Sequence, residues 1–513
     1  LTLAMSILPE EIPVAFSTFQ ALGAFRLLRQ QVIVKQPQQV EVLGAATVIC
    51  ADKTGTLTQN RMRIAAWHDL SNGMTTMAEE SVLPPLSLIS HAMWSSETDP
   101  FDPMERAIHD LYAKTATHDA RGDFEQVHEY PIGGEPPKMT HIFRNASGQT
   151  IIAVKGAPEG ILAQSHLGDA EKESLSGVAR KFAEMGYRVL GVGRAEWAEE
   201  KWPASQEEFT FEPIGLMAFE DPPKENMKET ILQLKQAGIR LKMITGDHPG
   251  TARAIASGIG LDHGTAYLTG EQVRRMDAEE LQRKVKDTAV FARMFPEAKL
   301  RVIEALKANG EVVAMTGDGV NDAPALKAAH IGIAMGRRGS EVAKGAAALI
   351  LADDDLTHMT GAIALGRKIS ENLRKAVRYI VSIHIPIIGI VTIPLLLQWS
   401  FTDIFTPVHV IFLELVMGPT CSIIYENEPM EPGTMSRPPY PLGRGFLSLR
   451  QLSTSIVQGL VITAACLMMG WTVLQQGHDH ATVRTMIFLT LLLSNIFLTL
   501  VNRSFHETIF RTI

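Results

Sequence analysis

Long apolar segments near both ends of the chain, separated by a polar middle, limit its possible folds more than any other feature. Residues 377–399, 408–425, 452–474 and 486–501 are each near the roughly 20 residues that a helix needs to cross a bilayer. Residues 1–25 are also mostly apolar, and we expect a fifth transmembrane helix there. From residue 36 to about 357 no run is long enough to span. The pattern predicts a helical membrane bundle that carries a soluble domain.

The basic residues assign a side of the membrane to that soluble part. They gather at alternate ends of the apolar segments, at Arg26, Arg29, Lys35, Arg374, Lys375, Arg378, Arg437, Arg444, Arg450 and Arg503. The loops 400–407 and 475–483 contain no Lys or Arg. Because basic loops face the cytosol, we expect a multi-pass integral protein with its polar middle cytosolic. A bacterial plasma membrane is the default location, since no targeting segment is in view.

Composition excludes several classes of protein. The net charge is −8, and no basic cluster could neutralise a run of phosphates, so we expect no nucleic-acid partner. The three cysteines are widely spaced and form neither a disulfide framework nor a CxxC metal site. No GxxxxGK loop occurs, which argues against a P-loop nucleotide site.

The polar middle divides into two kinds of sequence. Apolar strand-like pieces alternate with amphipathic helices such as 225–237 and 298–308, which predicts a parallel sheet wrapped by helices. Residues 67–211 differ, with many Gly and Pro turns and short strands, and we expect them to form an inserted α+β domain. The insertion splits the α/β domain into residues 44–66 and 212–361.

Asp52 lies at the carboxyl end of a predicted strand. The apolar run 45–49 leads into Cys50 and then into the letters DKTGTLT at 52–58. Open α/β sheets present ligands at this edge, and a carboxylate there can attack a phosphoryl group to form an aspartyl phosphate. For a single aspartate taken alone, an ordinary polar turn after a strand is the favoured interpretation.

DKTGTLT matches the phosphorylation motif of the P-type ATPases. Further motifs follow in that family's order: KGAPE at 155–159, DPPK at 221–224, TGD at 245–247 and TGDGVNDAP at 316–324. The chain therefore resembles a P-type cation pump, closest to the calcium-pump-like branch. The resemblance implies a haloacid-dehalogenase-like phosphorylation domain with an inserted nucleotide-binding domain. It also implies that the chain is a C-terminal fragment, because such pumps carry an actuator domain and three helices before this point.

The resemblance assigns the phosphorylation chemistry, with ATP as substrate and Mg²⁺ as cofactor. The implied catalytic residues are Asp52, Lys53, Thr54, Thr245, Gly246, Asp247 and Lys299. Asp52 would be the nucleophile and Lys299 would neutralise developing charge. The magnesium ligands would be Asp52, the Thr54 carbonyl and Asp318, supported by Asn321 and Asp322.

Thr54 separates a pump from a soluble phosphatase of the same fold. Those phosphatases place a second aspartate two residues after the nucleophile as general acid/base, and here that position is Thr54. The aspartyl phosphate should therefore persist. The pump's own hydrolytic base lies in a TGE loop, and Thr269-Gly270-Glu271 has those letters. We interpret it as a helix cap instead, because it falls between the catalytic motifs.

The resemblance also implies nucleotide contacts in the inserted domain. They are Glu105, Lys155, Gly156, Arg188 and Asp221. The calcium pumps stack a phenylalanine on adenine, and the nearest equivalents here are Ile132 and Tyr130, so the stacking residue stays open.

Carboxylates within the apolar segments point to an ion path, because charge inside a bilayer is costly. Glu10 lies between Pro9 and Pro13, which should break the helix, and Glu414 lies mid-span in 408–425. Both resemble ligands of one cation site in the calcium pumps, and His384 is a further candidate. A second calcium site is not expected, because Ile387, Met417 and Gly418 replace polar residues.

We expect Ca²⁺ transport first, with H⁺, Mn²⁺ or Mg²⁺ as alternatives. A soluble-type phosphatase and a transport-incompetent fragment are the remaining alternatives. Protein partners cannot be read from the sequence.

Overall fold

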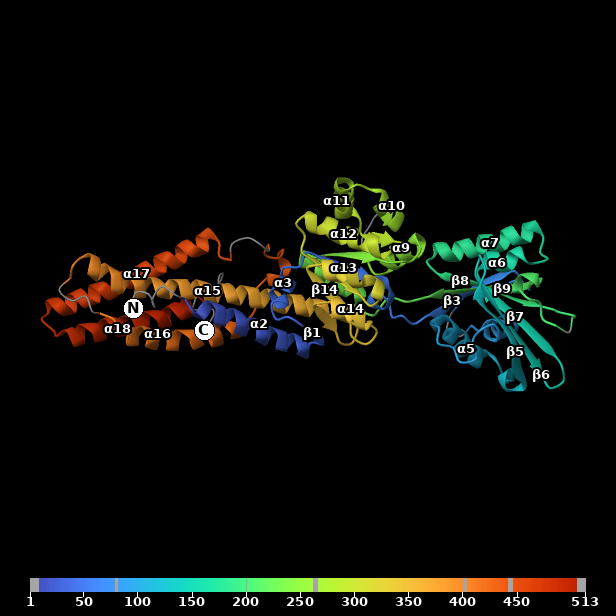
Figure 1. Ribbon diagram of the computed structural model, residues 1–513, viewed down its shortest axis with the longest axis horizontal. Helices are drawn as coiled ribbons and strands as arrows, with labels where there is room; N and C mark the ends of the chain where they lie inside the picture. Colours follow the sequence, from blue (N-terminus) through green and yellow to red (C-terminus); the bar gives the residue numbers. More distant parts are fainter. Residues whose placement is uncertain are drawn as a thin grey trace. The chain divides into compact units, whose positions relative to one another are not determined.

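The computed structural model describes residues 9–78, 82–199, 201–261, 266–399, 404–441 and 446–504 (Figure 1). It contains two compact units. The first consists of Leu1–Cys50, Leu232–Leu241 and Leu300–Ile513, and the second of Ala51–Ile231 and Lys242–Lys299.

An eight-stranded sheet has the order β1-β15-β14-β13-β2-β10-β12-β11. Its strands are β1 (Val32–Val34), β2 (Val48–Asp52), β10 (Arg240–Ile244), β11 (Tyr267–Thr269), β12 (Val290–Ala292), β13 (Val313–Gly317), β14 (Ile331–Met335) and β15 (Leu349–Leu351). Strands β2, β13, β14 and β15 are parallel, as are β10, β12 and β11, while β1 joins β15 antiparallel. β13 and β14 are buried along their whole length, as expected of strands covered on both faces. The predicted parallel sheet is confirmed.

Short helices connect these strands. They are α3 (Gln39–Gly44), α8 (Met227–Gln236), α9 (Pro249–Gly258), α10 (Gly270–Arg275), α11 (Ala278–Asp287), α12 (Pro296–Ala308), α13 (Ala323–Ala328) and α14 (Glu341–Ala346). Helices α9 and α12 both begin with a proline, which fits a first turn because that N–H needs no helical partner.

The second unit also contains a seven-stranded antiparallel sheet, in the order β4-β3-β9-β8-β7-β6-β5. Its strands are β3 (Arg63–Asp69), β4 (Met74–Met77), β5 (Phe124–Gly133), β6 (Lys138–Asn145), β7 (Thr150–Gly156), β8 (Arg188–Ala195) and β9 (Glu212–Glu220). Its helices are α4 (Leu86–Trp94), α5 (Pro103–Thr115), α6 (Pro158–Ala163) and α7 (Asp169–Glu184).

Helices cover both faces of this sheet (Figure 1). Trp67 packs with residues of α4 and α5, whereas its neighbour Ala66 packs with residues of α6 and α7. Successive side chains on a strand point to opposite faces, so β3 contributes to both cores.

The predicted borders of the inserted domain, residues 67 and 211, lie within β3 and directly before β9. β3 runs unbroken from Arg63 to Asp69, and it pairs with β9, which begins at Glu212. Both strands therefore belong to the seven-stranded sheet rather than to the parallel one. The sequence pattern missed this because a strand's partner lies far away in the chain.

Five helices make up the rest of the first unit: α2 (Glu11–Arg29), α15 (His358–Leu396), α16 (Pro407–Thr420), α17 (Leu449–Gln475) and α18 (His480–Val501). In the described part of the chain, α15, α17 and α18 are long and apolar enough to cross a membrane. Helix α16 continues as a π-helical turn, Cys421–Tyr425.

Two helices extend beyond the predicted apolar segments. The helix expected at 377–399 begins at His358, so one continuous α15 joins the apolar segment to the region assigned to the soluble domain. Helix α2 extends to Arg29 rather than residue 25, and Pro13 lies in its first turn, where proline is tolerated. Residues 1–8 lie outside the described residues.

Buried charges hold the connections of this unit together. The Arg367 guanidinium donates to the backbone carbonyls of Gly44, Ala237, Thr434 and Arg437. The segment after α16 carries three acidic residues, each paired with a base from another element: Glu426 with Arg26, Glu428 with Arg503 and Glu431 with Lys375. These contacts fix the loop after α16 against α2, α15 and the end of α18.

Candidate functional site

Asp52 is the last residue of β2, and the chain turns there into a π-helical turn, Lys53–Leu57. Its Oδ1 accepts from the Lys53 backbone N–H at 2.6 Å, and its Oδ2 lies 3.1 Å from Lys299 Nζ. The Asp52 side chain is only 15% exposed and the Lys299 side chain only 8%. The carboxylate is thus held at the strand end by one amide and one ammonium group.

Lys53, the residue after Asp52, forms a second ion pair at this turn. Lys53 Nζ lies 2.5 Å from Asp247 Oδ2, and Lys53 is almost fully buried. Arg188 reaches Asp247 Oδ1 at 3.6 Å from β8. Asp247 therefore joins the nucleophile turn to the seven-stranded sheet.

Thr245 and Gly246 follow the buried strand β10. Thr245 is 1% exposed, and its Oγ1 accepts from the Asp247 N–H at 3.1 Å. Because the hydroxyl acts as acceptor here, its own proton remains to be donated. Gly246 has an open surrounding, with the nearest atom 4.0 Å from the position of an added Cβ.

Asp221 braces the nucleophile turn. Its Oδ2 accepts from Thr58 Oγ1 at 2.6 Å and its Oδ1 from the Arg61 N–H at 3.3 Å. Thr58 Oγ1 also accepts from the Gly55 N–H at 3.2 Å. The sequence analysis missed Thr58, although it ends the same motif as Asp52.

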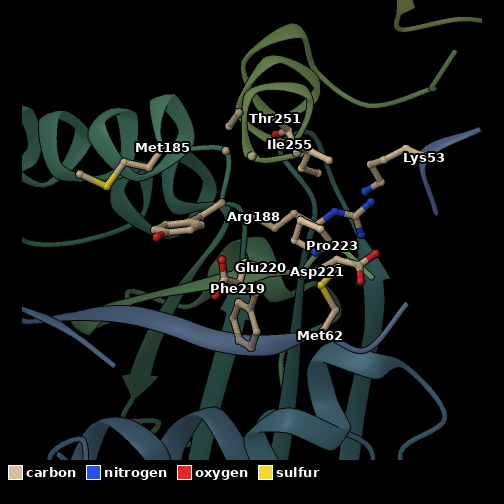
Figure 2. Close-up of a pocket in the computed structure, with 14 residues that line it drawn as sticks. Lys53, Met62, Met185, Arg188, Phe219, Glu220, Asp221, Pro223, Thr251 and Ile255 are labelled. Carbon is tan, nitrogen blue, oxygen red and sulfur yellow. The ribbon is translucent and has the colours of Figure 1, made fainter. Parts of the chain in front are cut away.

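A cavity of about 170 Å³ lies beside these residues. Figure 2 shows the side chains that line it. Arg188 and Lys53 point toward Asp221 from different elements, and Thr251 and Ile255 of α9 close another side. The cavity holds both cationic groups and apolar walls, which suits an anionic ligand with a flat or apolar portion.

The expected nucleotide residues fall into two groups. Arg188 and Asp221 line the cavity in Figure 2, whereas Glu105, Lys155 and Gly156 are not among its lining residues. Lys155 Nζ lies 2.5 Å from Glu105 Oε1, and both side chains are over 90% buried. Lys155 Nζ also donates at 2.8 Å to the Ser95 carbonyl and to Ser96 Oγ. Burial lowers the Lys155 pKa, and the Glu105 charge opposes that shift.

Gly156 has a packing role. An added Cβ would lie 2.5 Å from Lys138 Cα and from the Pro137 carbonyl oxygen. Any side chain at this position would collide with β6, so the close pairing of β6 and β7 accounts for the glycine.

Neither Tyr130 nor Ile132, the two candidates for stacking on adenine, presents an exposed aromatic ring. Tyr130 is 8% exposed, donates to the Pro203 carbonyl at 2.6 Å and packs edge-on against Phe209. Ile132 is 71% exposed but aliphatic. Tyr130 is therefore a core residue.

In the first unit, Asp318, Asn321 and Asp322 follow the buried strand β13. Asp322 is 2% exposed, and its Oδ2 accepts from the Gly319 N–H at 3.1 Å. The Asp318 carbonyl accepts from the Ser340 N–H at 2.8 Å. A Cβ at Gly317 would lie 2.5 Å from Asp322 Cβ, so glycine is needed there for Asp322 to fold over the strand end.

The helical part of the first unit buries a different glutamate from the one expected. Glu10 is exposed, whereas Glu11 is buried and its Oε2 lies 3.6 Å from His384 Nε2. Neither Glu11 carboxylate oxygen has a hydrogen-bond partner in the described part of the chain. His384 Nδ1 donates to the Ile380 carbonyl at 2.9 Å. Glu414, on α16, is partly buried.

Thr269 caps α10, as predicted. Its Oγ1 accepts from the Gln272 N–H, and Gln272 returns a bond to the Thr269 N–H. Glu271 pairs with Arg274 and Arg275 of the same helix. The capping interpretation is confirmed.

Comparison with known proteins gives two family matches. Residues 46–330 match the family model of haloacid dehalogenase-like hydrolases. Residues 402–513 match the model of the cation-transporting ATPase C-terminus.

The chain is also similar to individual curated proteins. It is 32% identical over 462 residues to calcium-transporting ATPase 1 of Bacillus cereus, covering 86% of this chain and 51% of that protein. Calcium-transporting ATPase 1 of Lactococcus lactis is 31% identical over 529 residues, with coverage of 99% and 60%. Probable cation-transporting ATPase F of Mycobacterium tuberculosis is 32% identical over 534 residues, with coverage of 94% and 58%. The chain thus spans about half to three fifths of these relatives.

The parallel sheet, the carboxylate at the end of β2 and the apolar helices agree with both family matches. The chain belongs to the haloacid dehalogenase-like hydrolases and, among them, to the P-type cation-transporting ATPases. Members of this family use ATP and Mg²⁺, and the apolar helices indicate a membrane protein.

Proposed function

We propose that this chain takes the γ-phosphoryl group of ATP onto Asp52 and uses that step to drive a cation across a membrane, with Ca²⁺ first. The observation that carries the proposal is the Asp52 carboxylate, held at the end of a buried strand 3.1 Å from Lys299 Nζ. In the reaction, an Asp52 oxygen forms a bond to the γ-phosphorus, the bond from that phosphorus to the β–γ bridging oxygen breaks, and ADP leaves.

The neighbouring groups fit roles in that step. Lys299 orients the Asp52 carboxylate and would then lie beside the phosphoryl oxygens, where its charge stabilises the transition state. The Thr245 hydroxyl and the Gly246 N–H, at the turn after β10, can donate to the same oxygens. Arg188 and Lys53, which line the cavity of Figure 2, supply positive charge for the nucleotide phosphates. Glu105 and Lys155 would form a separate part of the nucleotide site.

For magnesium, the donor set is suitable, since it consists of carboxylates and a backbone carbonyl. Asp52, the Thr54 carbonyl and Asp318 would hold the ion, with Asn321 and Asp322 in support. Within its own unit each carboxylate follows a strand, since Asp52 ends β2 and Asp318 directly follows β13. The ion would neutralise phosphate charge during transfer.

For transport, Glu414 and either Glu10 or Glu11 would supply carboxylates, with His384 nearby. The burial of Glu11 favours it over Glu10. A proton pump is the second candidate function, because the carboxylate of Glu11 faces an imidazole, which is an unusual partner for Ca²⁺ and a common one for a proton. Mn²⁺ and Mg²⁺ remain alternatives.

The proposed location is a bacterial plasma membrane, with several spans and the catalytic sheets in the cytosol. The distribution of Lys and Arg supports the orientation. The bacterial origin of the relatives named above supports the membrane.

Labelled ATP tests the central step. With Mg²⁺ and γ-labelled ATP, the chain should gain acid-stable, hydroxylamine-sensitive label. Asp52→Asn should abolish that label, while Asp69→Asn, at the end of β3, should keep it. Label that survives in Asp52→Asn would overturn the proposal. Dependence of labelling on added Ca²⁺, or instead on pH alone, would separate a calcium pump from a proton pump.

A further inference from the structure

Three ligand-bearing side chains meet on the seven-stranded sheet at a place that the phosphorylation chemistry does not use. Glu97, Glu129 and His141 each offer one ligand atom, and these atoms lie within 4.8 Å of one another. Glu129 and His141 are directly opposed on the antiparallel strands β5 and β6. Figure 1 shows these two strands side by side. Glu97 follows α4.

The His141 ring is the central observation. It is 0% exposed, and its Nδ1 lies 3.2 Å from the Ser96 carbonyl oxygen. A carbonyl can only accept, so Nδ1 carries the proton and Nε2 presents a lone pair. That Nε2 is buried and has no hydrogen-bond partner in the described part of the chain. An unpaired buried acceptor normally costs stability, so this position calls for a ligand.

The ligand that this position calls for lies between one ring nitrogen and two carboxylates. The ligand atoms of Glu97, Glu129 and His141 lie within 4.8 Å of one another. A cation between the three side chains would complete the coordination of the Nε2 lone pair and balance the two carboxylate charges.

We propose that Glu97, Glu129 and the Nε2 of His141 bind a divalent transition-metal ion, with Zn²⁺ the first choice and Mn²⁺ the second. Imidazole with carboxylates is a ligand set for such ions, whereas Ca²⁺ and Mg²⁺ take oxygen ligands. Bonds of about 2.0–2.1 Å place tetrahedral ligands about 3.4 Å apart, so ligand atoms that lie within 4.8 Å of one another would close in by up to about 1.4 Å. The Ser96 carbonyl orients the ring from its other nitrogen, as is usual for metal-bound histidine.

Such an ion would fix the segment after α4 against β5 and β6. The same segment supplies the Ser95 and Ser96 oxygens that accept from Lys155 Nζ. Metal occupancy would therefore also hold the Lys155–Glu105 pair in place. This inference does not depend on the proposed transport.

The test is Zn²⁺ binding to the full chain in detergent, measured by calorimetry after removal of metal with a chelator, with 1 mM Ca²⁺ and Mg²⁺ present. Glu129→Gln is the main variant, because its side chain is exposed and its loss should not disturb folding. Glu125→Gln is the matched control, since Glu125 lies on the same strand but is opposed to Arg144. X-ray absorption at the zinc edge reports whether a histidine is bound.

We expect the wild type to bind one equivalent that shows an imidazole signature, and Glu125→Gln to behave identically. Glu129→Gln should weaken the affinity by at least about tenfold. His141→Gln should remove the imidazole signature. No binding in the wild type, equal affinity in Glu129→Gln, or a histidine signature that persists in His141→Gln would each overturn the proposal.

Discussion

The carboxylates at Asp52 and Asp247 and the carboxylate of Glu11, between α2 and α15, are all mostly buried. They differ in how many charged or hydrogen-bonding partners surround them. Asp52 and Asp247 each have a lysine ammonium group within 3.1 Å. Glu11 has only the His384 ring, 3.6 Å away, and no hydrogen bond to either carboxylate oxygen in the described residues. Buried polar groups are normally paired, so the second region is the one whose partner is expected from outside the chain.

The difference separates two kinds of site. Around Asp52 the chain supplies its own counter-charge, the Lys299 ammonium group, before the substrate binds. Preorganised charges of this kind favour a transition state because they need no rearrangement during reaction. Beside Glu11 the described residues leave the carboxylate without a hydrogen-bond partner, which suits a site that binds and releases a cation.

The largest expected effect is on the rate of phosphoenzyme formation, when the Lys299 charge beside Asp52 is removed. Lys299→Ala should slow phosphoenzyme formation from ATP by about 10²–10³-fold, because the developing phosphoryl charge loses its nearest cation. Lys307→Ala is the matched control, since Lys307 lies on the same helix α12 and its ammonium donates to the Ala328 carbonyl instead of to Asp52. Rapid-quench labelling measures both rates. Equal rates in the two variants would show that Lys299 does not act on the phosphate.

A second variant tests the Lys155–Glu105 pair, which is satisfied but buried. Lys155→Ala leaves the Glu105 carboxylate without its cation, and we expect a loss of about 3–5 kcal/mol of stability. The double change Lys155→Met with Glu105→Gln should recover most of that loss, since no charge stays buried. Denaturant unfolding of the purified chain measures the free energy. A double variant as unstable as the single one would mean that packing, rather than charge, sets the cost.

The sequence predicted the parallel sheet, Asp52 at its edge and the three apolar spans of α15, α17 and α18, because hydrophobic periodicity and motif letters are local signals. It did not predict that β3 and β9 belong to the antiparallel sheet, because that depends on pairing between distant segments. Likewise, the DPPK motif identified Asp221 as a site residue, but it did not predict the hydrogen bond that Thr58 donates to Asp221.

The choice between Glu10 and Glu11 shows the same limit within two residues. Adjacent positions on a helix differ by about 100° around its axis, so a sequence with both glutamates cannot say which faces the bundle. Packing against α15 decides it, and the buried residue is Glu11.

That choice gives the third prediction. Glu11→Gln should raise the Ca²⁺ concentration for half-maximal phosphorylation by about tenfold, equivalent to about 1.4 kcal/mol. Glu10→Gln should raise it less, because Glu10 is exposed. The measurement requires the chain joined to the additional length that its relatives have. A larger shift in Glu10→Gln would return the ligand role to Glu10. A shift in the pH optimum of Glu11→Gln, without any Ca²⁺ effect, would favour the proton pump.

The smallest expected effect concerns His141, the unsatisfied group of the seven-stranded sheet. Its pKa is lowered in the folded state by burial, so below the unfolded value near 6.5 the unfolded chain binds the proton first. Stability should therefore fall as the pH drops below about 6.5, by at most about 1.4 kcal/mol per pH unit for this one group.

Unfolding midpoints at pH 7.5 and 5.5 in the presence of a chelator give the wild-type slope. His141→Gln should show a smaller slope, because glutamine does not titrate. An unchanged slope would mean that the folded ring takes up its proton as easily as the unfolded one. In that case an imidazolium, rather than a metal ion, would already complete the charge between Glu97 and Glu129. The stability at low pH therefore distinguishes a metal ion from an imidazolium as the positive charge between Glu97 and Glu129.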